Sequence, residues 1–142
     1  LEDKYNLEAI IEPEPNNILE KIQSRDVDCI VSEYDLPDKD GIEILKEVRE
    51  HYPRIPFIMY TARGSETIAK DAISAGATDY LIKGRDAETF ETLSRRITTA
   101  VQEVQDKKWK EKSLRRQYIA IILAILSILI GLMSLFFSLY IL

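Results

Sequence analysis

The feature that most constrains this chain is an uncharged apolar stretch over residues 118–142. Its only polar side chains belong to three serines and two tyrosines. A helix of about 25 residues rises roughly 37 Å, which exceeds the roughly 30 Å hydrocarbon core of a bilayer. A helix buried in a soluble core is the alternative, but such a helix has no need of so long an uncharged run. The stretch therefore predicts a transmembrane helix.

Charge is distributed unevenly before this stretch. Residues 1–106 hold 23 acidic and 13 basic residues, a balance of −10, whereas residues 107–117 hold six basic residues and one acidic, a balance of +5. Basic residues beside a span mark its cytoplasmic side, so we expect a cell-membrane protein whose soluble part faces the cytoplasm. The cluster could instead bind nucleic acid, but its place beside the span favours anionic lipid headgroups. Its members are Lys107, Lys108, Lys110, Lys112, Arg115 and Arg116.

Small residues inside the apolar stretch recur at spacings of four and three. This spacing places them on one helix face, where small side chains let two helix backbones approach closely. We expect a homodimer through this face, although small residues are also common in spans that have no partner. Tyr118 and Tyr140 are expected at the two membrane interfaces. The small residues are Ala120, Ala124, Ser127, Gly131, Ser134 and Ser138.

Residues 1–104 alternate between short apolar runs and longer stretches with helical spacing, and we expect them to form one domain. Near-continuous apolar strands between helices indicate an α/β fold, a doubly wound parallel sheet covered on both faces. Ser65 suits a helix N-cap, and Gly76 suits the position after a helix. Residues 105–117 are expected to be a helical linker before the span at 118–142. The expected strands are 7–11, 27–31, 55–60 and 79–82, and the expected helices are 17–24, 42–51, 66–75 and 87–105.

Polar side chains follow three of the expected strands where each strand ends. They are Glu33, Thr61 and Lys83. Each alone has an ordinary explanation as a loop acid, a helix-entry hydroxyl or a surface charge. Because ligands of open parallel sheets bind at the carboxyl ends of strands, their joint placement favours a shared site. The lone cysteine, Cys29, lies in an apolar run and is expected to be a core residue in a reducing compartment.

Three segments resemble the response-regulator receiver domain, a flavodoxin-like fold. VSEYDLPDKDGIEILKEVR is similar to its phosphorylation-site loop and third helix, PFIMYTARGSE to its fourth strand and loop, and GATDYLIKG to its fifth strand. The sequence of these loops is most similar to that of receiver modules of archaeal sensory proteins. In that family an aspartate accepts a phosphoryl group from a histidine kinase with Mg²⁺. The resemblance places Thr61 and Lys83 at the phosphoryl-binding positions and Tyr80 at the switch position, and Asp35, Pro37, Asp40 and Gly41 keep the loop pattern.

The phosphoacceptor position departs from the family. Counting back four residues from Pro37 reaches Glu33, where the family has aspartate. The carboxylate of glutamate reaches one methylene further, about 1.3 Å, which is large against the placement that phosphoryl transfer requires. We therefore expect Glu33 to be a poor phosphoacceptor, and its pairing with Lys83 would imitate part of the phosphorylated charge pattern.

The amino-terminal segment also departs from the family. The resemblance implies a central first strand, a first helix and an acidic pair that binds Mg²⁺, and all of these would precede Leu1. We therefore expect a piece of a longer product, through a missing start or a degraded gene. No cofactor is expected from the residues present, and Mg²⁺ only if that acidic pair exists.

Three classes of function follow from these observations. The first is a membrane-tethered, non-enzymatic pseudo-receiver of two-component phosphorelay signalling, which contacts a histidine kinase or another signalling protein. The second is a genuine phosphoacceptor whose acidic pair lies in the lost segment. The third, a flavodoxin-like enzyme, is disfavoured because the sequence has no glycine-rich phosphate loop or catalytic triad, and His51 stands alone. Nucleic acid is not an expected partner.

Overall fold

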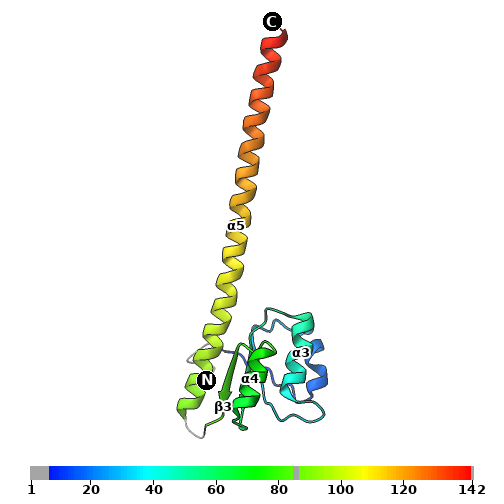
Figure 1. Cartoon of the computed structure of the whole chain (residues 1–142), viewed down its shortest axis with the longest axis vertical. Coiled ribbons are helices and arrows are strands. Elements are labelled where there is room, and N and C mark those ends of the chain that lie inside the picture. The colour runs from blue at the N-terminus through cyan, green and yellow to red at the C-terminus, as the bar shows by residue number, and fades with distance from the viewer. Residues whose placement is uncertain (1–6, 85–86, 142) are drawn as a thin grey trace. The chain divides into compact units, whose positions relative to one another are not determined.

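A computed structural model describes residues 7–84 and 87–141 (Figure 1). Residues 1–6, 85, 86 and 142, which include the start of the expected domain and the end of the expected span, lie outside the described residues. The chain divides between Val104 and Gln105 into two units. The elements are η1 (Pro15–Asn17), α2 (Ile18–Ser24), β1 (Ile30–Ser32), α3 (Gly41–His51), β2 (Phe57–Thr61), α4 (Glu66–Ser74), β3 (Asp79–Ile82) and α5 (Ala87–Ile141).

The three strands form one parallel sheet in the order β1, β2, β3. Successive side chains of a strand point to opposite faces, and on β2 this divides the buried residues into two sets. Phe57 and Met59 belong to one hydrophobic cluster, whereas Ile58 and Tyr60 belong to another. The predicted parallel α/β sheet with both faces covered is confirmed.

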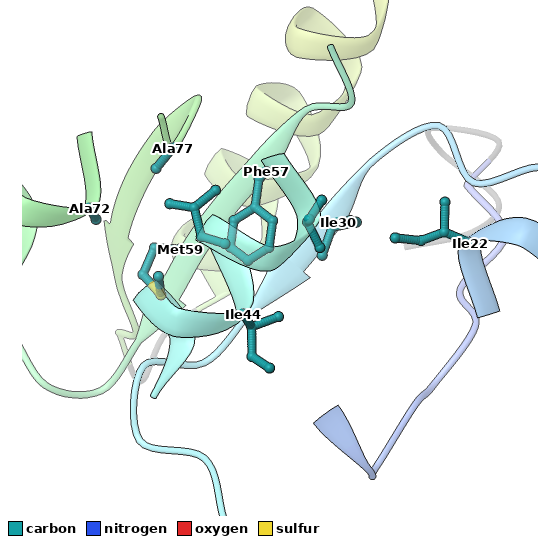
Figure 2. Close-up of a cluster of buried hydrophobic side chains, with 9 residues drawn as sticks. Ile22, Ile30, Ile44, Phe57, Met59, Ala72 and Ala77 are labelled. Atoms are coloured by element: carbon teal, nitrogen blue, oxygen red, sulfur yellow. The ribbon is translucent and has the colours of Figure 1, made fainter. Parts of the chain in front are cut away.

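The larger cluster lies between the sheet and helices α2, α3 and α4 (Figure 2). Leu45 and Val48 of α3 and Phe57 of β2 are completely buried there. Each such side chain contributes about 1.5–3 kcal/mol relative to an exposed one. On the opposite face Leu93, near the start of α5, packs against the smaller cluster. The sheet edge that carries the polar residues is therefore held from both sides.

Side chains fix the starts of α3 and α4. Asp40 Oδ1 accepts hydrogen bonds from the backbone N–H groups of Ile42 (2.9 Å) and Glu43 (2.8 Å), and the Glu43 carboxylate accepts from Asp40 N. This reciprocal capping box satisfies backbone donors that the first turn leaves without partners. Ser65 caps α4, and Gly76 has a φ of 98° beyond its end, so both predictions are confirmed.

Arg49 joins α3 to two neighbouring loops. Its guanidinium donates two hydrogen bonds to the carbonyl of Gly76, at 2.9 and 2.8 Å, and one to the carbonyl of Ile55 at 2.8 Å. The spacing of apolar residues did not indicate this role, because the partners lie in loops that only the folded chain brings near α3.

The strand expected at residues 7–11 is wrong, because residues 7–14 have no regular secondary structure. A strand needs a hydrogen-bonded neighbour, and within the described residues β1 pairs with β2 alone. The strand expected at 27–31 also begins later, at Ile30. Its register places Cys29 opposite Pro56, which has no N–H to donate to the ladder.

Residues 105–141 of the second unit are entirely helical, and their side chains are exposed. By length and composition alone, residues 88–141 contain one helix apolar enough to cross a membrane. A Cβ added to Gly131 would meet no atom within 4 Å. Near the far end the rings of Phe136 and Tyr140 stack with centroids 6.4 Å apart. Membrane insertion stays a prediction.

Candidate functional site

The three polar residues expected at the strand ends lie together at the carboxyl edge of the sheet. Glu33 follows β1 directly, Thr61 ends β2, and Lys83 follows β3. Lys83 Nζ lies 2.5 Å from Glu33 Oε2, and the hydroxyl of Thr61, on the strand between them, helps to lower the pKa of the Glu33 carboxyl. The backbone N–H of Lys83 donates to the carbonyl of Thr61 at 2.8 Å. The site therefore combines a carboxylate, a hydroxyl and an ammonium group.

Both carboxylate oxygens of Glu33 are engaged. Oε2 contacts Lys83, and Oε1 accepts a hydrogen bond of 2.8 Å from the backbone N–H of Tyr34. Burial is the largest single effect on the pKa of Glu33 and raises it. The hydrogen bonds from Lys83, Thr61 and Tyr34, together with the charge of Lys83, outweigh burial and lower the pKa below its ordinary value. Glu33 is therefore ionised at neutral pH.

Lys83 is also positioned by an aromatic ring. Its ammonium nitrogen lies 5.5 Å from the ring centroid of Tyr60, a buried residue of β2. A cation over a ring face is attracted by about 0.5–1 kcal/mol at a partly exposed site. Tyr60 thus holds Lys83 over the sheet edge, a role that the sequence did not indicate.

Gly41 determines how the loop after β1 turns into α3. Its backbone N–H donates to the carbonyl of Tyr34 at 2.8 Å. A Cβ at this position would lie 2.3 Å from the carbonyl oxygen of Glu33 and 2.9 Å from Met59 Sδ. Only glycine permits this close approach of the helix start to the site.

The other loop residues shape the backbone. Pro37 accepts a hydrogen bond of 2.8 Å from the N–H of Lys39, and Asp38 between them has a φ of 68°, a left-handed conformation that aspartate tolerates. Asp40 caps α3. Asp35 pairs with Arg63, so neither Asp35 nor Asp38 takes the place of Glu33 at the strand end.

Arg63, in the loop after β2, connects that loop to both neighbouring strand ends. Its guanidinium lies 3.1 Å from Asp35 Oδ1 and 5.8 Å from the ring centroid of Tyr34. The backbone N–H of Arg63 donates to Thr61 Oγ1 at 3.0 Å, and its backbone carbonyl accepts a hydrogen bond of 2.7 Å from the Tyr80 hydroxyl. Tyr80, the residue at the expected switch position, is thereby linked to Thr61 through the backbone of Arg63.

Sequence reasoning missed Arg63, Tyr34 and Tyr60. Arg63 offered one signal, a positive charge two residues beyond Thr61, opposite in sign to Asp35 two residues beyond Glu33. These opposite charges indicate a contact only once the two loops are known to lie side by side.

The described residues do not fit a Mg²⁺ site. Mg²⁺ requires several oxygen ligands in octahedral geometry. Residues 7–84 and 87–141 contain no group of three or more His, Cys, Asp or Glu side chains that could hold a metal. The oxygens of Glu33 are already bonded to a cation and a backbone N–H.

Cys29 lies beside the smaller cluster and is partly buried. Burial, followed by the nearby charge of Asp28, raises the pKa of its thiol to about 12. A thiol in this state is not a nucleophile at neutral pH. Cys29 therefore packs as a small apolar side chain, as expected.

The remaining predicted residues lie on α5 in the second unit. The six basic residues of the cluster at 107–116 are exposed, as are Tyr118 (68%) and Tyr140 (83%). Their expected roles, in lipid contact and at membrane interfaces, stay predictions.

Comparison with known proteins decides the family. The family model described as "Response regulator receiver domain" matches residues 2–95. The chain belongs to the response-regulator receiver domain family. It carries the receiver domain of a two-component response regulator, and the archaeal subtype suggested by its loops stays a prediction.

Curated relatives of this receiver include two bacterial regulators. The chain is 38% identical over 84 residues to the DNA-binding transcriptional regulator NtrC of Proteus hauseri, covering 58% of this chain and 18% of the relative. It is 39% identical over 77 residues to the transcriptional regulatory protein ZraR of Klebsiella oxytoca, covering 54% and 17%. The receiver thus spans less than a fifth of the length of these relatives.

Solved structures agree on the receiver fold. A putative response regulator from Chloroflexus aurantiacus matches with a TM-score of 0.53 at 27% identity, covering 61% of this chain and 73% of that one. The receiver domain of Francisella response regulator 1452 matches with a TM-score of 0.61 at 23% identity, covering 69% and 78%, which supports the fold alone.

Proposed function

We propose that this chain is a membrane-anchored receiver module that signals through protein contact and does not accept a phosphoryl group. The observation that carries the proposal is the ion pair of Glu33 with Lys83 at the sheet edge. A carboxylate already neutralised by the ammonium group, with its second oxygen bonded to Tyr34, is a poor nucleophile. Its extra methylene also displaces it by about 1.3 Å from the place of an aspartate.

The same pair supports a fixed signalling state. In the family, a phosphoryl group on the acceptor contacts the threonine and lysine positions. Here the longer carboxylate of Glu33 pairs directly with Lys83, beside Thr61 at the end of β2. The permanent negative charge at these positions takes the place of part of the phosphoryl charge. The domain would then present one surface constantly to its partner.

A histidine kinase or another signalling protein is the partner that this proposal requires. NtrC of Proteus hauseri is named as a DNA-binding regulator, but this chain matches only 18% of it. We propose no nucleic-acid partner, no cofactor and no enzymatic reaction for the receiver unit itself.

Membrane anchoring is the second part of the proposal. The uncharged stretch is long enough to cross a bilayer, its side chains are exposed, and exposed tyrosines lie near both ends. In water such a surface would cost about 25 cal/mol for each Å² left exposed. The basic cluster before the span supports a cytoplasmic receiver. The small-residue face supports pairing of two spans, with open space at Gly131.

A genuine phosphoacceptor is the competing function, and it is supported by family membership and by Thr61, Lys83 and Tyr80 at their expected positions. The full chain in detergent can be incubated with acetyl phosphate and Mg²⁺ and analysed by intact mass spectrometry. We expect no added phosphoryl mass. A hydroxylamine-sensitive acyl phosphate on Glu33 would overturn the proposal.

Glu33→Asp provides the matched control for this experiment. It shortens the side chain by one methylene and restores the family residue. Lys39→Arg, in the same loop but paired with Glu47 at 2.7 Å, controls for nonspecific effects of substitution. If Glu33→Asp alone gains phosphoryl mass, the length of the Glu33 side chain explains why the natural chain is not phosphorylated.

A further inference from the structure

We infer that one face of the helix segment before the span, formed by Lys108, Lys112 and Arg115, binds anionic lipid headgroups. This inference rests on the proposed membrane anchoring and names the class of lipid that the anchor selects. These three residues are called the basic face below.

The basic face follows from helix geometry. Residues 105–141 form one continuous stretch of α5, and the three residues are spaced by four and then three. At 3.6 residues per turn they lie within about 60° of one another around the axis. Arg116, four residues after Lys112, extends the same face. Lys107 and Lys110 lie outside it.

Reach to the membrane surface is sufficient. With Tyr118 at the interface, Lys112 lies about 9 Å and Lys108 about 15 Å further along the helix. Lysine and arginine have long side chains whose charged ends extend toward polar surroundings. Spans tilt by about 20° on average, which brings one side of the emerging helix nearer the surface. Charge acts over a Debye length of about 8 Å beyond the side chains at physiological salt.

Charge complementarity selects the occupant. The segment at 107–117 carries a balance of +5 in a chain whose preceding residues carry −10. Each basic residue near the surface of an anionic bilayer raises the binding constant of such a segment about fivefold. Around the helix axis Lys108, Lys112 and Arg115 lie roughly 80° to 140° from the centre of the small-residue face, so pairing of two spans would leave them accessible.

The chain contains its own reporter for this contact. Its single tryptophan, Trp109, lies within the segment, is 68% exposed, and stands three residues before Lys112, so the two side chains are neighbours on the helix surface. Energy transfer from Trp109 to a dansyl-labelled lipid therefore reports the lipids around the basic face.

The full chain is reconstituted into phosphatidylcholine vesicles with a minor fraction of phosphatidylglycerol. Energy transfer is compared between dansyl-labelled anionic lipid and dansyl-phosphatidylcholine at equal density. We expect stronger transfer to the anionic lipid, and a loss of this preference in high salt. Lys108→Gln/Lys112→Gln should reduce the preference at least about twofold. Lys107→Gln/Lys110→Gln, which removes the same charge from other faces, should retain most of it.

The outcomes separate this inference from the proposed function. Failure of the chain to float with vesicles after carbonate extraction would refute the anchor itself. A floating chain without lipid preference, or equal losses in the two double variants, would refute the basic face alone. Displacement of the anionic lipid by a soluble DNA duplex would identify a competing macromolecular partner and overturn the assignment to lipid.

Discussion

Glu33 and Lys83 are separated by 50 residues in the chain, yet the carboxylate and ammonium groups lie 2.5 Å apart. Two parallel strand connections bring them to one edge, where Thr61 completes the site between them. The pair uses the position at which a receiver carries its phosphoacceptor. Its contribution to stability must therefore depend on the ionisation of Glu33.

Glu33→Gln should remove a pH-dependent part of the free energy of unfolding. The pKa of Glu33 is lower in the folded than in the unfolded chain. The ionised carboxylate therefore stabilises the fold above the ordinary glutamate pKa, and this contribution is lost as pH falls through the folded value. Because Lys83 is 40% exposed, solvent screening limits the effect to about 1 kcal/mol or less.

Urea unfolding of the full chain in detergent, at a series of acidic pH values, measures this effect. Lys83→Met should show the same loss, and the double variant should lose little more than either single variant. Fully additive losses would show that the two groups do not stabilise one another.

Gly41→Ala should destabilise the domain by about 1–3 kcal/mol, because the added methyl group would overlap the backbone of Glu33. The midpoint of urea unfolding measures the loss. Gly64→Ala is the control, since its Cβ would meet only the side chain of Ile82, most closely Cδ1 at 2.8 Å, the end of a side chain that is 56% exposed and free to turn away. Equal losses in both variants would argue against a special requirement at Gly41.

Tyr80→Phe should loosen the loop that follows β2. It removes the hydroxyl that donates to the carbonyl of Arg63 at 2.7 Å, a bond that contributes about 0.5–1.5 kcal/mol. Hydrogen exchange of residues 62–64, followed by mass spectrometry, should become faster. Tyr34→Phe keeps the ring that the Arg63 guanidinium contacts and should leave exchange unchanged. Unchanged exchange in Tyr80→Phe would show that the Tyr80 hydroxyl does not hold this loop in place.

Ser127→Leu/Gly131→Leu should abolish self-association of the span in a membrane two-hybrid assay. The larger side chains would prevent close approach along the small-residue face. Ile122→Phe/Leu129→Phe enlarges the opposite face and should leave the signal intact. A dimer signal that survives the Ser127→Leu/Gly131→Leu substitution would show that the spans do not pair through the small-residue face.

Features that depend on neighbouring residues could be predicted from the sequence. The N-cap Ser65 and the left-handed Gly76 act within one turn of their own helix. The alternation of apolar runs with helical spacing was sufficient for the parallel α/β sheet, because burial of both faces leaves a local pattern. The ends of three strands then indicated Glu33, Thr61 and Lys83 before any contact was known.

Only the tertiary structure decided which distant groups meet. The apolar residues near Ile11 suggested a strand, but a strand requires a hydrogen-bonded neighbour, and local pattern carries no information about one. Arg63 and Tyr60 became part of the site through loop packing and strand register, which set distances between residues far apart in the chain. The sequence by itself determined the helices, three of the strands and the chemistry at the strand ends; packing of the sheet determined the pairing of Glu33 with Lys83, because that pairing depends on the positions of two strands relative to a third.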